Sequence, residues 1–151
     1  MRRRRQSGAA MVELALLLPL LVLLLLGTVH FGLIMFYYTR VDKAVHDAAR
    51  YASMRTYSEQ GTDAGDYITA VTATAVFGNP SGDGPAAAPG LSTGSVTVSV
   101  NQATAGERPQ TVTVTVNAYS IPGAMGTVSL ANKPSATFPF LGRYIPPIEL
   151  P

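Results

Sequence analysis

The sequence predicts an α+β protein in which one long N-terminal helix packs with a short helix and a small antiparallel β-sheet. Three observations predict this: an uncharged apolar run at residues 14–36, an amphipathic pattern that continues it to residue 57, and two later segments in which valine alternates with polar residues. The first two have the length and period of a helix. The third has the period of two that half-buried strands show.

The apolar run from Leu14 to Phe36 is long enough to cross a membrane as a helix. Its 23 residues span about 35 Å at roughly 1.5 Å per residue, and a hydrocarbon core is about 30 Å thick. A secretory signal would have a shorter apolar region followed by a small-x-small cleavage site, which residues 27–30 match poorly. We therefore expect the segment to stay in the membrane.

Charge predicts the orientation of this segment. Arginines fill positions 2–5, whereas signs are mixed after the run, as in Arg40 and Asp42. Excess basic charge stays on the cytoplasmic side, so we expect a single-pass protein of the cell membrane with its C-terminal domain outside. Lys+Arg number 11 against 9 Asp+Glu, and without the four arginines of residues 1–8 the balance is 7 against 9. The basic excess belongs to the leader, so no nucleic-acid partner is expected.

The helix is expected to continue beyond the membrane. Apolar positions recur at spacings of three and four within residues 39–57, and this helix packing stripe consists of Val41, Ala44, Val45, Ala48 and Ala52. Charged residues lie on another face, as in an amphipathic helix. One rod from about Ala9 to Tyr57, on the order of 70 Å long, is the prediction. Pro19 removes one backbone hydrogen bond within it, so a kink or a short melted stretch is expected there.

The residues after the rod predict a small domain that packs without disulfides, since the chain has no cysteine. Residues 58–65 are expected to form a loop, and residues 66–77 a short second helix that Gly78 closes. Residues 78–94 are rich in Gly, Pro and Ala, which predicts an exposed loop with no packed core of its own.

Strands follow this loop. Val96, Val98 and Val100 alternate with polar residues, and so do Val112, Val114 and Val116. The two segments predict an antiparallel hairpin whose valine face covers the helix stripe, because a hairpin alone is barely stable. Residues 126–131 are a candidate third strand, and the proline-rich tail at 134–151 receives no assignment.

The residue types argue against catalysis. His30 and His46 are the two histidines, and no nucleophile motif or glycine-rich phosphate loop is present. Asp42 and His46 are four residues apart, but a solvated surface pair is far commoner than a shared metal. An ionisable His30 inside the span is a functional candidate by default, yet it lies close enough to the outer interface to find water or a backbone carbonyl. We expect no enzyme activity, cofactor or metal.

Residues 6–53 resemble a known family. A basic leader ending at Gly8, Glu13 five residues on, an apolar helix with an early proline and an amphipathic extension resemble type IV pilin-like proteins. The chain is similar to the TadE-like minor pilins or pseudopilins of the Tad (tight adherence, Flp) pilus system. The similarity lies in the sequence GAAMVELALLLPLLVLLLLGTVHFG and in AARYAS at 48–53. The related TadF and TadG proteins share this pattern, and the length with a single small exported domain favours TadE.

The resemblance implies that a prepilin peptidase cuts between Gly8 and Ala9, and that Glu13 pairs with the freed amino group on its own or a neighbouring chain. Implied partners are that peptidase, other pilins or pseudopilins, the pilus assembly machinery and membrane lipid. Major Flp pilins and some pseudopilins carry Tyr directly after the glutamate, where this chain has Leu14. Major pilins are also much shorter, and both points favour a minor component. The alternative is a membrane-tethered extracytoplasmic binding module that never enters a filament.

These expectations divide the chain into four parts. They are a cytoplasmic prepilin leader at 1–8, a transmembrane helix at 9–38, an amphipathic helix extension at 39–57 and a small exported α+β domain at 58–151.

Overall fold

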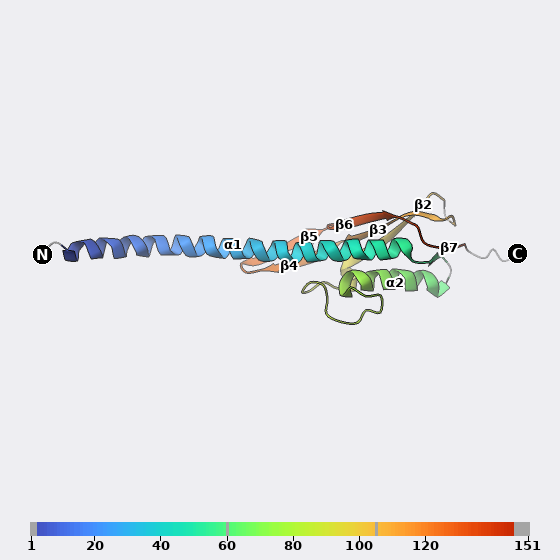
Figure 1. The fold of residues 1–151 in the computed structure, drawn as a ribbon, viewed down its shortest axis with the longest axis horizontal. Helices are drawn as coiled ribbons and strands as arrows, with labels where there is room; N and C mark the ends of the chain where they lie inside the picture. The colour runs from blue at the N-terminus through green and yellow to red at the C-terminus, as the bar shows by residue number, and fades with distance from the viewer. Residues whose placement is uncertain (1–2, 60, 105, 147–151) are drawn as a thin grey trace.

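The computed structural model describes the backbone of residues 3–59, 61–104 and 106–146. It also describes their side chains, except at residues 3–7 and 61–64. In chain order the elements are α1 (Arg3–Met54), β1 (Tyr57–Ser58), α2 (Gly61–Phe77), the 3-10 helix η1 (Thr93–Ser95), β2 (Val96–Gln102), β3 (Pro109–Val116), β4 (Ala118–Gly123), β5 (Gly126–Ala131), β6 (Ser135–Pro139) and β7 (Tyr144–Ile145). Figure 1 shows α1 as a long rod whose C-terminal half carries all the other elements. The α+β class with a long apolar helix, a short helix and small antiparallel sheets is confirmed.

Helix α1 is uninterrupted over its 52 residues and contains Pro19. The melted stretch considered at Pro19 is therefore absent, and α1 shows no sharp bend in Figure 1. A single proline removes one N–H donor, and the leucines around it keep theirs. The rod ends three residues before the expected Tyr57, which instead begins β1.

Helix α2 confirms the expected second helix but begins at Gly61. The loop expected at 58–65 is therefore wrong for residues 61–65, and also for Ser58, which belongs to β1. Gly61 and Gly65 lower the helix propensity of this segment. Tertiary packing often overrides such intrinsic propensity. The end of α2 is as expected: Gly78 has a φ of 77° and donates its N–H to the Thr74 carbonyl at 2.9 Å. A positive φ at this position is typical of a glycine that ends a helix.

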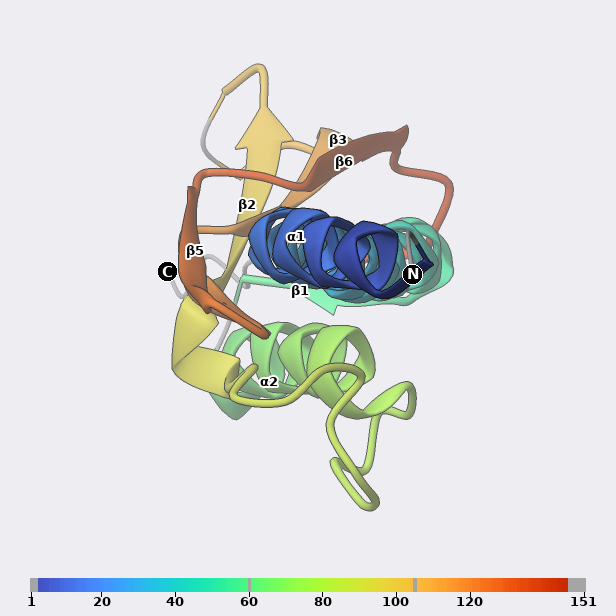
Figure 2. The same cartoon turned by 90° about the vertical axis from the view of Figure 1, so that its left-hand side faces the viewer.

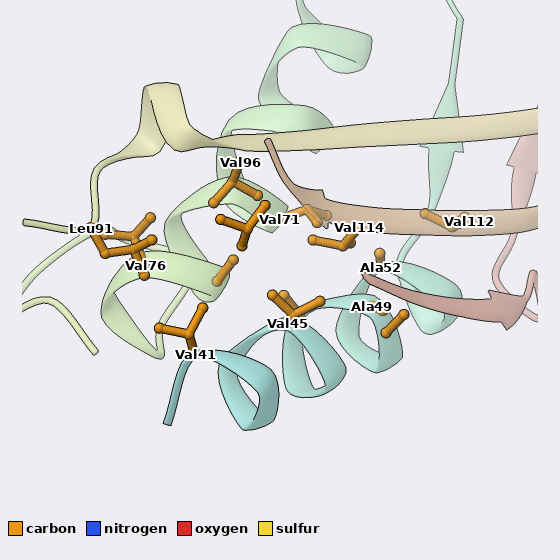
Figure 3. Packing of buried hydrophobic residues seen from close by; sticks show 14 of the residues in the cluster. Val41, Val45, Ala49, Ala52, Val71, Val76, Leu91, Val96, Val112 and Val114 are labelled. Atoms are coloured by element: carbon orange, nitrogen blue, oxygen red, sulfur yellow. The ribbon is translucent and has the colours of Figure 1, made fainter. Parts of the chain in front are cut away.

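The loop after α2 is not simply exposed, and the expectation for residues 78–94 needs correction. Ala88 and Leu91 are 1% and 6% exposed and belong to the core. The Ala87 N–H also donates to the Val76 carbonyl at 2.7 Å. The loop therefore folds back on the end of α2, and Figure 3 shows Leu91 beside Val76.

The valine hairpin is confirmed, with Val96 opposite Val116, Val98 opposite Val114 and Val100 opposite Val112. Strand β6 extends this sheet on the free edge of β3, giving the order β2-β3-β6. The candidate strand at 126–131 is confirmed as β5, but it pairs with β4 in a separate hairpin. Strands β1 and β7 form a two-residue parallel pair.

The core lies where the C-terminal half of α1 passes between β3 and β6 on one side and α2 on the other, as Figure 2 shows. Strand β3 contacts α1, whereas β2 contacts α2, so the valine face covers both helices and not the α1 stripe alone. In Figure 3, Val45 of α1 lies among Val71 of α2 and Val114 of β3. Packing the branched side chains of three elements together is what holds this cysteine-free domain.

Candidate functional site

The N-terminal half of α1 is bare. Every residue from 8 to 29 is exposed, and the large apolar side chains between Met11 and Leu26 are 43% to 75% exposed. Helix α1 is long and apolar enough over Gly8–Met54 to cross a membrane. So much exposed apolar surface is strongly unfavourable in water, at about 25 cal/mol per Å². The arrangement is consistent with single-pass membrane anchoring.

The residues of the expected processing site lie at the start of this bare segment. The Gly8–Ala9 bond is inside α1, and its backbone is helical. A Cβ added to Gly8 would meet no atom within 4 Å, so the fold of this chain does not require a glycine there. Glu13 follows Ala9 by four residues and therefore lies on the same helix face, one turn on. Among the described side chains Glu13 has no ion-pair partner.

The predicted packing stripe lies at the other end of α1. Val41, Val45, Ala48 and Ala52 are at most 1% exposed, and Ala44 is half-buried. Ala49, which the predicted stripe leaves out, is also fully buried. These side chains face the chain's own α2 and sheet. The small alanines allow α2 to approach α1 closely.

Tyr67 of α2 holds the two helices together at the end of α1. Its hydroxyl is buried and donates to the Ala52 carbonyl at 2.6 Å. Burial, with a smaller contribution from the neighbouring Tyr57, raises the pKa of Tyr67 well above its ordinary value. This contact was not predicted from the sequence, although a tyrosine on the apolar face of an amphipathic helix is a signal for a buried hydroxyl with a partner.

His30 contacts the β4–β5 hairpin. Its Nδ1 accepts a hydrogen bond from the backbone N–H of Met125, with an N–N distance of 3.0 Å. The sequence predicted water or a backbone carbonyl as the partner and did not predict this backbone N–H. A backbone N–H can only donate, hence Nδ1 carries no proton in this arrangement. No local pattern indicates that these two residues, 95 positions apart, would meet.

The Asp42 and His46 pair stays on the surface. Nδ1 of His46 lies 3.7 Å from Oδ1 of Asp42 and 2.9 Å from its backbone oxygen, and both side chains are about half exposed. Within residues 3–59, 61–104 and 106–146, no three His, Cys, Asp or Glu side chains gather in a way that could hold a metal.

The N-terminal segment is similar to a known protein family. The family model described as TadE-like protein matches residues 8–50. No curated protein and no solved structure matches the chain. The matched residues begin at Gly8 and include the bare half of α1 and most of its packing stripe. Residues 8–50 of the chain are therefore similar to TadE-like proteins.

Proposed function

We propose that this chain is a minor pilin or pseudopilin that takes part in assembling a Tad/Flp-type pilus, with a structural and not a catalytic role. The observation that carries the proposal is the TadE-like match over residues 8–50. It is supported by the division of α1 into a bare apolar half and a half built into a folded domain. Such a helix can pass from lipid into a bundle of similar helices without unfolding its domain.

We further propose that a prepilin peptidase cuts between Gly8 and Ala9. A peptide bond must leave the helical conformation to enter a protease active site. Glycine in a helix is less stable than alanine by about 1 kcal/mol, which favours local unwinding at Gly8. The open space around Gly8 supports this role, because nothing in the packing of the chain itself explains the glycine.

Glu13 is the proposed assembly residue. After the cut, Ala9 carries a free amino group one turn before Glu13. A carboxylate near a helix N-terminus gains only about 0.3 to 1 kcal/mol from the helix dipole. In a dry bundle, an ion pair between Glu13 and the amino group of a neighbour would fix the axial register, since a slip would leave both charges buried and unpaired.

The association is tested by co-purification with other pilus components from membranes. Glu13→Gln keeps the shape and removes the charge, so the variant should insert and fold but retain on the order of tenfold less partner, equivalent to about 1.4 kcal/mol. Glu107→Gln is the matched control, because Glu107 is exposed on the folded domain. Wild-type amounts of partner on Glu13→Gln would contradict the pairing.

A membrane-tethered binding module is the second candidate. The observation that favours it is an open groove of about 540 Å³ on the folded domain, lined by Phe36, Tyr37, Arg40 and the loop at 85–90. An ordinary anchor has no reason to lose residues 1–8, so removal of the leader separates the two functions.

A further inference from the structure

The β4–β5 hairpin extends along α1 toward its bare half, beyond the rest of the domain (Figure 1). Its tip consists of residues 123–126, and the Met125 N–H bonds His30, which lies inside the apolar run. A Cβ on Gly123 would lie 2.5 Å from Nδ1 of His30, so only glycine allows the tip to lie this close to the helix. The tip is therefore fixed to the apolar part of α1.

Helix length sets the depth of this contact. If the hydrocarbon begins at Leu14, the first residue after the charged Glu13, a core of about 30 Å takes roughly 20 residues and ends near Leu33. His30 then lies about 5 Å inside the outer boundary, because each helical residue rises roughly 1.5 Å. A tilted helix needs more residues to cross, which places His30 deeper still.

The chemistry of the tip suits that depth. No charged residue occurs from Ala118 to Asn132. The Met125 side chain is 59% exposed. A backbone N–H without a partner is costly in hydrocarbon, but the tip donor of Met125 is bonded to His30. His30 of α1 thus satisfies a polar group of the hairpin.

We propose that the tip of the β4–β5 hairpin enters the outer leaflet, where Met125 contacts lipid acyl chains and His30 positions the tip. The inference rests on α1 crossing the membrane and is independent of peptidase cleavage and of pilus assembly. Its failure therefore leaves those proposals untouched.

A single tryptophan reports on the contact, because the chain has none. Full-length Met125→Trp is placed in phosphatidylcholine vesicles with and without brominated acyl chains, which quench nearby tryptophan. The matched control is Met54→Trp, since Met54 has the same 59% exposure and lies about 36 Å along α1 from His30. We expect strong quenching and blue-shifted emission at position 125 and neither at position 54.

Equal quenching at both positions overturns the proposal. Blue-shifted emission at position 125 without quenching by bromine also overturns it, because the tip would then be covered by a second copy of the chain. Val128→Trp is an independent reporter higher on β5, at a side chain 39% exposed. Its expected quenching lies between those of the other two positions, and quenching equal to that at position 54 counts against the proposal.

The role of His30 is tested in the Met125→Trp background. His30→Leu removes the acceptor and should reduce quenching at position 125 at least twofold. His30→Gln keeps an acceptor oxygen and should restore most of it. Gly123→Ala, which forces the tip off the helix, should act like His30→Leu. Unchanged quenching in His30→Leu shows that His30 does not position the tip.

Discussion

The Tyr67 hydroxyl completes the C-terminal end of α1. The last four carbonyls of a helix have no partner within it, and Tyr67 supplies one to Ala52 from a buried position on α2. A buried carbonyl that loses its donor costs about 1 to 3 kcal/mol. This hydroxyl thus adds a polar link between α1 and α2 to the apolar packing of the core.

Tyr67→Phe should therefore lower the free energy of unfolding by about 1 kcal/mol at neutral pH. The substitution should also reduce the loss of stability at alkaline pH. The phenol of the unfolded chain titrates near the ordinary tyrosine pKa of 10.0, whereas burial raises the pKa of folded Tyr67. Above pH 10 the folded state keeps a proton that the unfolded state has lost, so stability falls as pH rises, and Phe removes this contribution.

Chemical denaturation of the detergent-solubilised chain at neutral and alkaline pH measures both effects. Tyr38→Phe is the control, because its hydroxyl makes no hydrogen bond among the described residues. Identical stability of Tyr67→Phe and Tyr38→Phe across this range would show that the bond to Ala52 contributes nothing.

Single residues also show where sequence reasoning stops. The burial of Val41 and Val45 follows from a local helical period. The bonds from Tyr67 to Ala52 and from Met125 to His30 join residues 15 and 95 positions apart, and no local pattern encodes them.

At the scale of elements, the packed half of α1 forms one wall of the core, with Val45 only 1% exposed among α2 and β3. Val45→Asp places an unpaired charge there, at a cost of about 3 to 5 kcal/mol. For a domain of this size we expect the melting temperature to fall by on the order of 10 to 20 °C. Circular dichroism of the detergent-solubilised chain measures the change.

Thr39→Asp is the matched control, since Thr39 is β-branched and exposed on the same helix. It should melt within a few degrees of wild type. If Val45→Asp melts with the control, the stripe does not stabilise the domain.

The elements that the sequence predicted share strong local periods, as in the valine alternation of β2 and β3. The elements that the sequence did not predict lack such periods. Strand β6 lies in a proline-rich tail and exists because it pairs with the edge of β3. Strand β4 contains Pro122 and gains its place from β5 and α1. The extra turns of α2 contain two glycines, whose propensity disfavours helix.

At the scale of the whole molecule, one helix serves two environments. Its residues 8–29 are all exposed, and its second half is an internal part of a domain. The boundary between them lies where the β4–β5 hairpin meets His30. The pilin-like role that we propose needs this division, because the exposed half must remain available to lipid and then to neighbouring helices while the domain stays folded.

The measurement that tests this account most directly is the intact mass of the full-length chain extracted from membranes after coexpression with an active cognate prepilin peptidase. We expect a chain that begins at Ala9. Gly8→Asp should yield only the uncut chain, whereas Gly65→Asp, at an exposed glycine with open space around it, should be cut like wild type. A prepilin that the same peptidase cuts serves as the positive control. If that prepilin is cut and only uncut wild-type protein is recovered, the account is contradicted.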